Sequence, residues 1–297
     1  MMKLRLLSMV CFGLLFGTAV SQTTDLARIE YLHIPFSNSN NSIDRYRALV
    51  QAPIPLQVGS GQFLVIGLEY RNHQINIGEP VPFDPNVVKS IQNMEAYLGY
   101  TFKLNEDWRL GFKGGIRIAS NLEHKIMSDD IIYLAAAYAI LDKKNDKEEK
   151  PYRWIIGLNY STTPGRSYPL PLINYYREFH PQWTYTLGVP KTNIRHYINT
   201  SKKDAFQAFV TLDNFFGNIQ DNIVIQGNPV VAENISMTNV LTGIGYEHYF
   251  TEHLLLYVYG AHTIYNEFRL RDNNRETAYI IDDANSFYLR TGLKFKF

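Results

Sequence analysis

Side chains alternate between apolar and polar with a period of two residues along much of this chain. Residues 286–297, SFYLRTGLKFKF, place the phenylalanines and leucines on one face and the arginine and lysines on the other. Successive side chains of a β-strand point to opposite faces, so the pattern predicts a strand with one apolar side. Segments 94–104 and 108–118 repeat it over about 11 residues each, the length that a tilted strand needs to cross a bilayer.

Further segments follow the same alternation with weaker contrast, and with the three above they total 14 strands. These are 26–36, 43–56, 61–75, 130–141, 151–161, 170–179, 183–190, 193–199, 204–214, 236–250 and 254–264. Because 193–199 is short and the first strand is ambiguous, the expected count is 12 to 14. The sequence DIIYLAAAYAILD also fits a helix, but its neighbours are strands and no helical partner is present.

The N-terminus has the features of an export signal. Lys3 and Arg5 precede an apolar run over 6–17, and small residues end at Ser21. This order is typical of a secretory signal peptide, which predicts cleavage of 1–21 and a barrel domain over 22–297. The alternative is an uncleaved membrane anchor.

Composition excludes several classes of function. A formal net charge of +1 is not the basic footprint of a general nucleic-acid binder. Cys11, the single cysteine, lies in the predicted signal peptide, so the exported protein would lack disulfides, thiolate metal sites and cysteine nucleophiles. After the signal there is no apolar run of the length that a membrane-spanning helix needs.

Three short polar turns share aromatic flanks. They start at Asn105, His180 and Thr251, and each interval between them holds four expected strands, so all three should lie on one side. Aromatic residues beside short turns are typical of a barrel wall where it meets lipid headgroups, although ordinary hairpins are an alternative. The expected aromatic girdle is Tyr100, Phe102, Trp108, Tyr176, Phe179, Trp183, Tyr249 and Phe250.

Long polar connections are expected at 76–90, 119–129, 215–235 and 265–285, alternating with the short turns. The charged segment 143–150 falls on the short-turn side by strand count. It is either a long periplasmic turn or a sign that the expected strand order is wrong nearby. The fold class predicted is all-β, a single antiparallel transmembrane β-barrel of about 12–14 strands with short periplasmic turns and long extracellular loops. Pairing of the last strand with the first would satisfy both edges.

Several segments resemble known outer-membrane barrels. The closing GLKFKF with Phe297 is similar to the C-terminal assembly signature of bacterial outer-membrane barrels. LARIEYLHIPFSNSNNSIDRYRALVQAPIPL, FLVIGLEYRN and HPQWTYTLGVPKTNIRHY resemble an uncharacterised outer-membrane β-barrel family, a domain of unknown function. The resemblance implies the outer membrane of a Gram-negative bacterium, contact with its lipid, and recognition of the C-terminal strand by the barrel-assembly machinery. It implies no activity and no functional residues.

The face opposite the apolar one carries many cations. Expected lumen residues are Arg45, Arg47, Arg71, Lys103, Arg109, Lys113, Arg117, Arg153, Arg290, Lys294 and Lys296, with the acids Glu69, Glu95 and Glu247 among them. Fixed cations raise the local concentration of anions, which favours a passive pore for small anionic solutes. The alternative is a plugged structural or surface-binding barrel without transport, because tyrosines and acids could fill the interior.

An enzyme is less well supported. None of the eight histidines lies in an HExxH or GxSxG context. The acid pairs Asp129-Asp130 and Asp282-Asp283 read as solvated loop charges, and His248 with His253 would need a third metal ligand. We therefore expect no catalytic residue, no metal and no cofactor, with an outer-membrane hydrolase as a weaker alternative. Recognition of a partner or glycan by the long loops is a third possibility.

Overall fold

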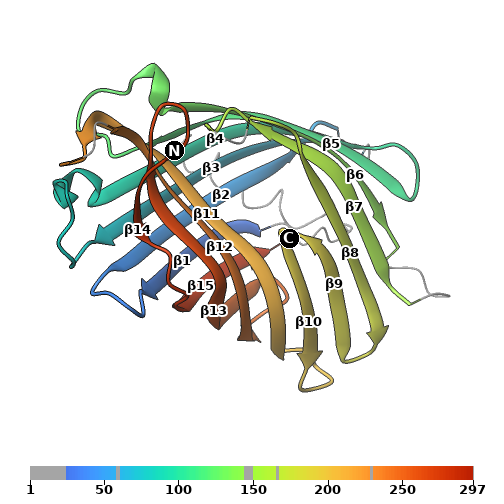
Figure 1. Ribbon diagram of the computed structural model, residues 1–297. Helices are drawn as coiled ribbons and strands as arrows, with labels where there is room; N and C mark the ends of the chain where they lie inside the picture. The colour runs from blue at the N-terminus through green and yellow to red at the C-terminus, as the bar shows by residue number, and fades with distance from the viewer. Residues whose placement is uncertain (1–24, 58–60, 144–149, 165–166, 228–229, 297) are drawn as a thin grey trace, which may run out of the picture.

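The structure is a computed structural model that describes residues 25–57, 61–143, 150–164, 167–227 and 230–296. The predicted signal peptide and the assembly residue Phe297 lie outside these residues. Within the described part, the chain forms 15 strands and two short 3-10 helices (Figure 1). Among these residues no helix has the length and apolar character to cross a membrane.

Bounds of the elements agree with most of the expected segments. In chain order they are β1 (Asp25–Pro35), β2 (Ser42–Pro55), β3 (Phe63–Asn76), η1 (Pro85–Val88), β4 (Ser90–Lys103), β5 (Trp108–Ser120), η2 (Ser128–Asp130), β6 (Ile131–Asp142), β7 (Tyr152–Ser161), β8 (Leu170–His180), β9 (Trp183–Val189), β10 (Lys191–Tyr197), β11 (Asp204–Val224), β12 (Val231–Tyr249), β13 (Leu254–Arg271), β14 (Thr277–Asp282) and β15 (Phe287–Lys296). The alanine-rich segment is a strand, β6, as predicted.

The strands close into one antiparallel ring. From β1 to β13 each strand pairs with its sequence neighbours, and β15 pairs with β13 on one side and β1 on the other. β14 pairs with the upper part of β13 and continues the path of β15, so the wall has 14 strands. The prediction of an antiparallel barrel of 12–14 strands closed by its last strand is confirmed.

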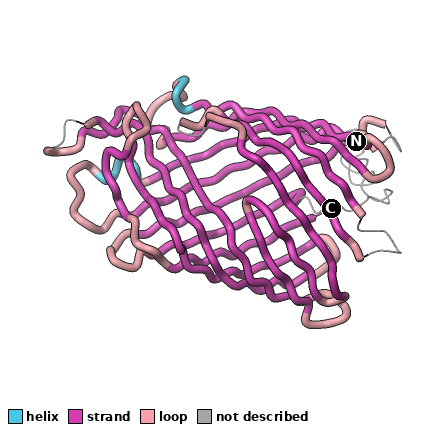
Figure 2. The backbone as a smooth tube through the Cα atoms, turned by 45° about the vertical axis from the view of Figure 1, so that its right-hand side comes forward, coloured by secondary structure: helices cyan, strands magenta, loops and turns pink. Residues whose placement is uncertain are grey.

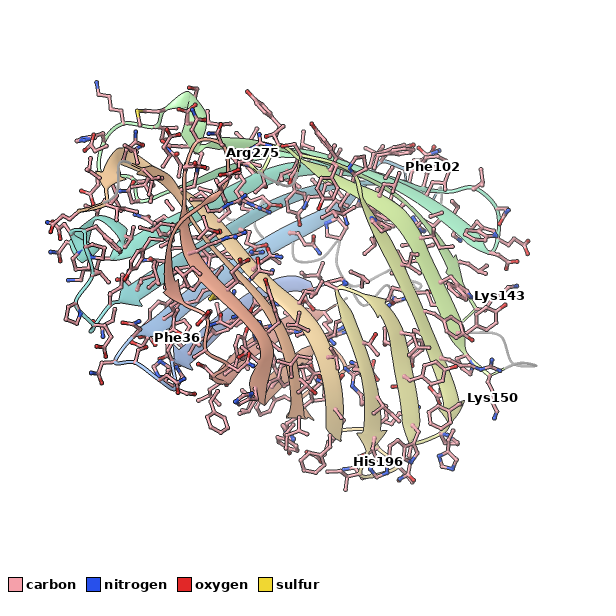
Figure 3. All side chains as sticks on the ribbon, in the orientation of Figure 1. Phe36, Phe102, Lys143, Lys150, His196 and Arg275 are labelled. Atoms are coloured by element: carbon pink, nitrogen blue, oxygen red, sulfur yellow. The ribbon has the colours of Figure 1, made fainter. Side chains whose placement is uncertain are left out.

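The two ends of the barrel differ in their connections. The turns after β4, β8 and β12, predicted to share one side, lie at one end, which we call the turn end. β6 ends at Asp142 and β7 begins at Tyr152 at this same end, so the connection between them lies on the short-turn side, as its strand count predicts. The other end, the loop end, carries both 3-10 helices (Figure 2). Figure 3 shows Phe36 toward the loop end and Lys143 and Lys150 toward the turn end.

An apolar belt surrounds the outside of the wall. Every wall strand contributes at least one exposed large apolar side chain: Ile29, Val50, Leu68, Leu98, Phe112, Tyr133, Leu158, Ile173, Leu187, Ile194, Val210, Ile244, Val258 and Leu289. A soluble protein does not expose a continuous apolar band of this kind. The belt is the lipid-facing surface of a transmembrane barrel.

Toward the loop end the polarity of the wall reverses. On β3 the outward residue Leu68 is 60% exposed and the inward Glu69 is buried. Further along the same strand the outward residue is Gln74 and the buried inward one is Ile75. The sequence of β3 is therefore apolar outside within the belt and apolar inside beyond it, as in a soluble β-protein.

The inward apolar residues at the loop end form a core. Leu32, Ile34, Ile43, Ile75 and Ile91 from β1–β4 pack in one cluster with Phe215, Ile219, Ile235, Met237, Phe268 and Leu270 from β11–β13. The segments 215–235 and 265–285 were predicted as polar loops, and that prediction is wrong. Their buried apolar residues instead continue β11, β12 and β13 as strands beyond the belt, with β14 paired alongside.

The end of β11 crosses the opening and touches β5. Asn218 pairs in parallel with Ser120, and the backbone N–H of Asn121 donates to the carbonyl of Asn218 at 3.2 Å. We call this contact the seam. It separates the loop end into a tube, made by β11–β15 with β1–β5, and the segment of wall β6–β10 that lies outside the tube.

A buried carboxylate holds the seam together. Asp130 is fully buried, and its oxygens accept hydrogen bonds from Asn218 at 2.8 Å and from Gln220 at 2.7 Å. Burial alone would raise the pKa of Asp130, but hydrogen bonds from the Met127 backbone and from Asn218, Ser120 and Gln220 hold that pKa below its usual value. Asp130 is thus a structural anion, which explains one member of the Asp129-Asp130 pair.

We predict that Phe112→Arg destabilises the barrel by about 2–4 kcal/mol, because it places a charge on the lipid face near the middle of β5. Unfolding of the refolded variant in lipid by guanidinium measures the loss. Asn76→Arg is the control, since Asn76 ends β3 beyond the belt and should change stability little. Equal losses in both variants would show that the belt is misplaced.

We predict that Asp130→Asn costs about 1–3 kcal/mol at pH 7, because an amide cannot accept all the hydrogen bonds that the carboxylate does. The folded pKa of Asp130 is lowered, so its contribution is present above the unfolded value of about 3.9 and is lost as the pH falls through the folded pKa. The difference between wild type and variant in guanidinium unfolding should therefore shrink at pH 3. The exposed neighbour is the control, and Asp129→Asn should show no such difference.

Candidate functional site

On the side of the apolar core that faces the turn end, a buried ion network fills the tube. Asp213 on β11 accepts from Arg45 on β2 at 2.9 Å and from Arg290 on β15 at 2.5 Å. Glu30 accepts from Arg45 at 3.3 Å and from the Tyr257 hydroxyl at 2.6 Å. Because β2 and β11 are not neighbours in the wall, these contacts cross the interior and close the tube.

Glu30 and Asp213 are inward acids that the sequence analysis missed. The expected lumen set contained only Glu69, Glu95 and Glu247 as acids, although Glu30 and Asp213 also lie in expected strands. The period-two alternation of their strands could have located them. Asp213 follows the outward Leu212, and Glu30 follows the outward Ile29, so both acids point inward.

Other expected lumen cations are also paired. Glu69 is bridged by Arg47 at 2.8 Å and also by Arg71. Glu95 is bridged by Lys113 at 2.8 Å and by Arg117 at 2.7 Å. These six residues, four cations and two acids, line the inner side of β2–β5, so each acid offsets part of the positive charge of two neighbouring cations.

On the opposite wall Glu247 is the centre of a third network. Its carboxylate, almost fully buried, accepts from Arg195 at 3.2 Å, from Gln207 at 2.7 Å and from the Tyr259 hydroxyl at 2.6 Å. Arg195 was not among the expected lumen residues, because β10 had weak contrast. Glu247 points to the inner side of β12, toward the Tyr259 hydroxyl.

A cavity of about 630 Å³ opens beside this network at the turn end. Its lining residues are Arg153, Tyr176, Thr186, Asn193, Arg195, Tyr197, Ser201, Lys202, Lys203, Tyr249, Thr251, Glu252 and Lys296. We call it the basic chamber. Its size is within the range of small-molecule binding sites, and its lining combines cations, hydroxyl groups and tyrosine rings.

The chamber has a cationic lining. It holds the side chains of Arg153, Arg195, Lys202, Lys203 and Lys296 and one acid, Glu252. Arg195 is paired with Glu247, and Lys202 with Glu178 at 2.9 Å. Lys296 instead lies over the ring of Tyr249, with its Nζ 5.7 Å from the centroid. An excess of fixed positive charge in an enclosed space attracts anions.

The remaining expected lumen residues lie near the chamber or along the turn end. The Nζ of Lys294 lies 4.6 Å from the centroid of the Tyr257 ring. Arg109 donates to the Gly61 carbonyl at 2.8 Å, and the Lys103 side chain passes beside the same glycine. Of the expected set, the structure brings Arg153 and Lys296 together in the chamber. Lys202 and Lys203, which complete it, come from a connection that the strand pattern did not cover.

The aromatic girdle needs one correction. Tyr176 and Tyr249 line the chamber, so they face inward and are not part of an outer girdle. Alternation explains this, because the outward neighbour of Tyr176 is Tyr175, whose ring stacks on Trp154 with centroids 4.4 Å apart. The other expected members are Tyr100, Phe102, Trp108, Phe179, Trp183 and Phe250; the first two stack on one another at 5.4 Å, and Phe250 is 50% exposed.

The weaker candidate sites have structural partners. Asp282 accepts from the Ser39 hydroxyl at 2.7 Å, and His248 pairs with Asp204 at 2.7 Å. No cluster of three or more histidine, cysteine, aspartate or glutamate side chains suited to a metal ion occurs in the described part of the chain.

We predict that Asp213→Leu destabilises the protein by about 3–5 kcal/mol, because Arg45 and Arg290 would keep their buried charges without their shared partner. Guanidinium unfolding of the refolded barrel is the measurement, and adding Arg45→Met should restore part of the loss. Glu267→Leu breaks the more exposed pair with Arg269 and should cost about 0–1 kcal/mol. A small loss in Asp213→Leu would contradict the role of the network.

No family model matches this chain, and no curated protein matches it. Similar solved structures include the NanC porin (11% identity, 91% of this chain and 100% of that chain, TM-score 0.39) and the KdgM porin (9% identity, 91% and 99%, TM-score 0.35). LpxR from Salmonella typhimurium is another (7% identity, 91% and 100%, TM-score 0.37). Together, the closed ring of 14 strands and its outward apolar belt make this chain a β-barrel of the outer-membrane type.

Proposed function

We propose that this protein is a passive channel for small anionic solutes in the outer membrane of a Gram-negative bacterium. The observation that carries the proposal is the basic chamber, a cavity of about 630 Å³ that is lined by five cationic side chains and one acidic one. Its turn end faces the periplasm, since short turns lie on that side in outer-membrane barrels. Export by a signal peptide cleaved after Ser21, and assembly through the C-terminal strand with Phe297 as its signal, belong to the same proposal.

Solutes would pass beside the tube, since its interior is occupied by the apolar core and the Asp213 network. The strands β6–β10 lie outside the seam, and the chamber is lined by residues of β7, β8, β9 and β10. The route therefore follows the inner side of this part of the wall. No catalytic role is proposed for it.

A closed barrel that binds anions without passing them is the second candidate. One observation favours it: the core at the loop end packs β1–β4 against β11–β13 without a lumen between them. In that case the chamber would be a binding site open to the periplasm alone.

Single-channel current in a planar bilayer under a salt gradient tests the proposal, and we predict an anion-selective reversal potential. Lys203→Glu with Lys296→Glu places two acids in the chamber and should move the reversal potential toward cation selectivity. Lys89→Glu with Lys125→Glu makes the same change of charge at the loop end, outside the chamber, and should leave the selectivity unchanged. Cation selectivity of the wild type would overturn the proposal, and silence from folded protein would favour the closed barrel.

A further inference from the structure

Two neighbouring strands of the wall are too short to cross the hydrocarbon layer. β9 (Trp183–Val189) and β10 (Lys191–Tyr197) have seven residues each. A tilted transmembrane strand needs about 9–11. The hairpin that they form therefore ends within the belt, and its last outward residues, Leu187 and Val189, are both about half exposed.

β11 continues beyond the end of this hairpin without a partner on that side. β10 pairs with it from Ala205 to Thr211, and the Leu212 N–H donates to the Pro190 carbonyl at 3.0 Å. The next wall contact on this edge is the seam at Asn218. Among the described residues, 213–217 have no strand paired to this edge, and we call this place the notch. Asp213 is half-buried and Asn214 is exposed at this edge, whereas Phe215 and Phe216 beyond them are buried, so the notch offers polar groups at the border of the belt.

An apolar groove of about 560 Å³ lies on the outer face of the wall, beside the notch. Phe179, Tyr185, Leu187, Ile194 and Val210 form most of its sides, and the small side chain of Ala208 leaves space in its floor. Asn193 lines both this groove and the basic chamber. The apolar groove and the cationic chamber therefore meet at β10, on opposite sides of the same short strand.

Lys191 lies on the inner side of the wall, next to the notch. Lys191 follows Pro190 directly, and its Nζ donates to the Gln207 side chain at 2.9 Å. The Nζ lies 4.7 Å from the Phe209 ring centroid and 4.8 Å from that of Tyr259. Within the described part of the chain, no carboxylate lies within salt-bridge distance of it. A lysine amine held against aromatic rings without an acid partner can donate hydrogen bonds to an anionic headgroup.

We propose that the groove, the notch and the chamber form one lateral site for a single-chain amphipathic anion. The alkyl chain lies in the groove on the lipid side, and the anionic head reaches over the hairpin to Lys191 and the chamber. The inference rests on the proposed function, since it uses the same chamber, and it names the substrate class. An alkyl chain alone would occupy only the groove, and a small anion alone would occupy only the chamber.

The test measures equilibrium binding of radiolabelled dodecyl phosphate and of inorganic phosphate to the full barrel in phosphatidylcholine nanodiscs, with empty nanodiscs as background. We expect dodecyl phosphate to bind at least about 100-fold more tightly than inorganic phosphate, because its chain enters the groove. Ala208→Trp fills the groove and should reduce this advantage at least about tenfold. Lys191→Met removes the charge at the notch and should weaken dodecyl phosphate more than dodecanol.

Ala48→Trp is the matched control, because Ala48 is an exposed alanine on the lipid face of β2, away from the groove. It should bind dodecyl phosphate as the wild type does. If Ala208→Trp and Ala48→Trp bind equally, the groove holds bilayer lipid only and the proposal is overturned. A wild type that binds dodecyl phosphate but carries no current would instead overturn the channel and leave the lateral site standing.

Discussion

Pairing of every backbone group within the hydrocarbon layer is the constraint on which the rest of this structure depends. Lipid offers no hydrogen bonds, so a sheet that crosses it must close on itself. Here β15 satisfies that demand by pairing with β1 over most of its length. Once the ring is closed, alternation sends one side chain in two to lipid and the next to the interior, and each strand must carry two opposite chemistries.

The interior meets this demand in two ways along the barrel axis. Within the belt, inward charges are buried, and acids such as Asp213 and Glu247 are each bonded to more than one donor, as burial requires. Beyond the belt, water replaces lipid outside the wall, and the apolar side chains turn inward. The loop end is therefore a small soluble core continuous with a membrane barrel, and the ion network lies where the two meet.

The sequence predicted the wall well, because its signal is local. Period-two alternation located the strands, and the parity of the turns at Asn105, His180 and Thr251 gave their common end. The cap, by which we mean the apolar core at the loop end together with the seam, was not predictable in this way. The strands of 215–235 look polar when counted by composition, yet Phe215 and Ile219 pack against β1–β4, which are distant in the chain. The chamber was half predicted: Arg153 and Lys296 lie in strands, whereas Lys202 and Lys203 lie in a turn whose path depends on β11 and β12.

The seam also has a consequence for the order of assembly. Asn121 and Gln220, which meet there, are separated by 99 positions in the chain. The segment between them contains the five strands β6–β10, so the contact gains nothing until that whole section of wall has paired. Contacts so distant in sequence form late, because the entropy of closing the intervening loop must be overcome first. The cap should consequently be the last part to order, sealing the loop end after the barrel is already in the bilayer.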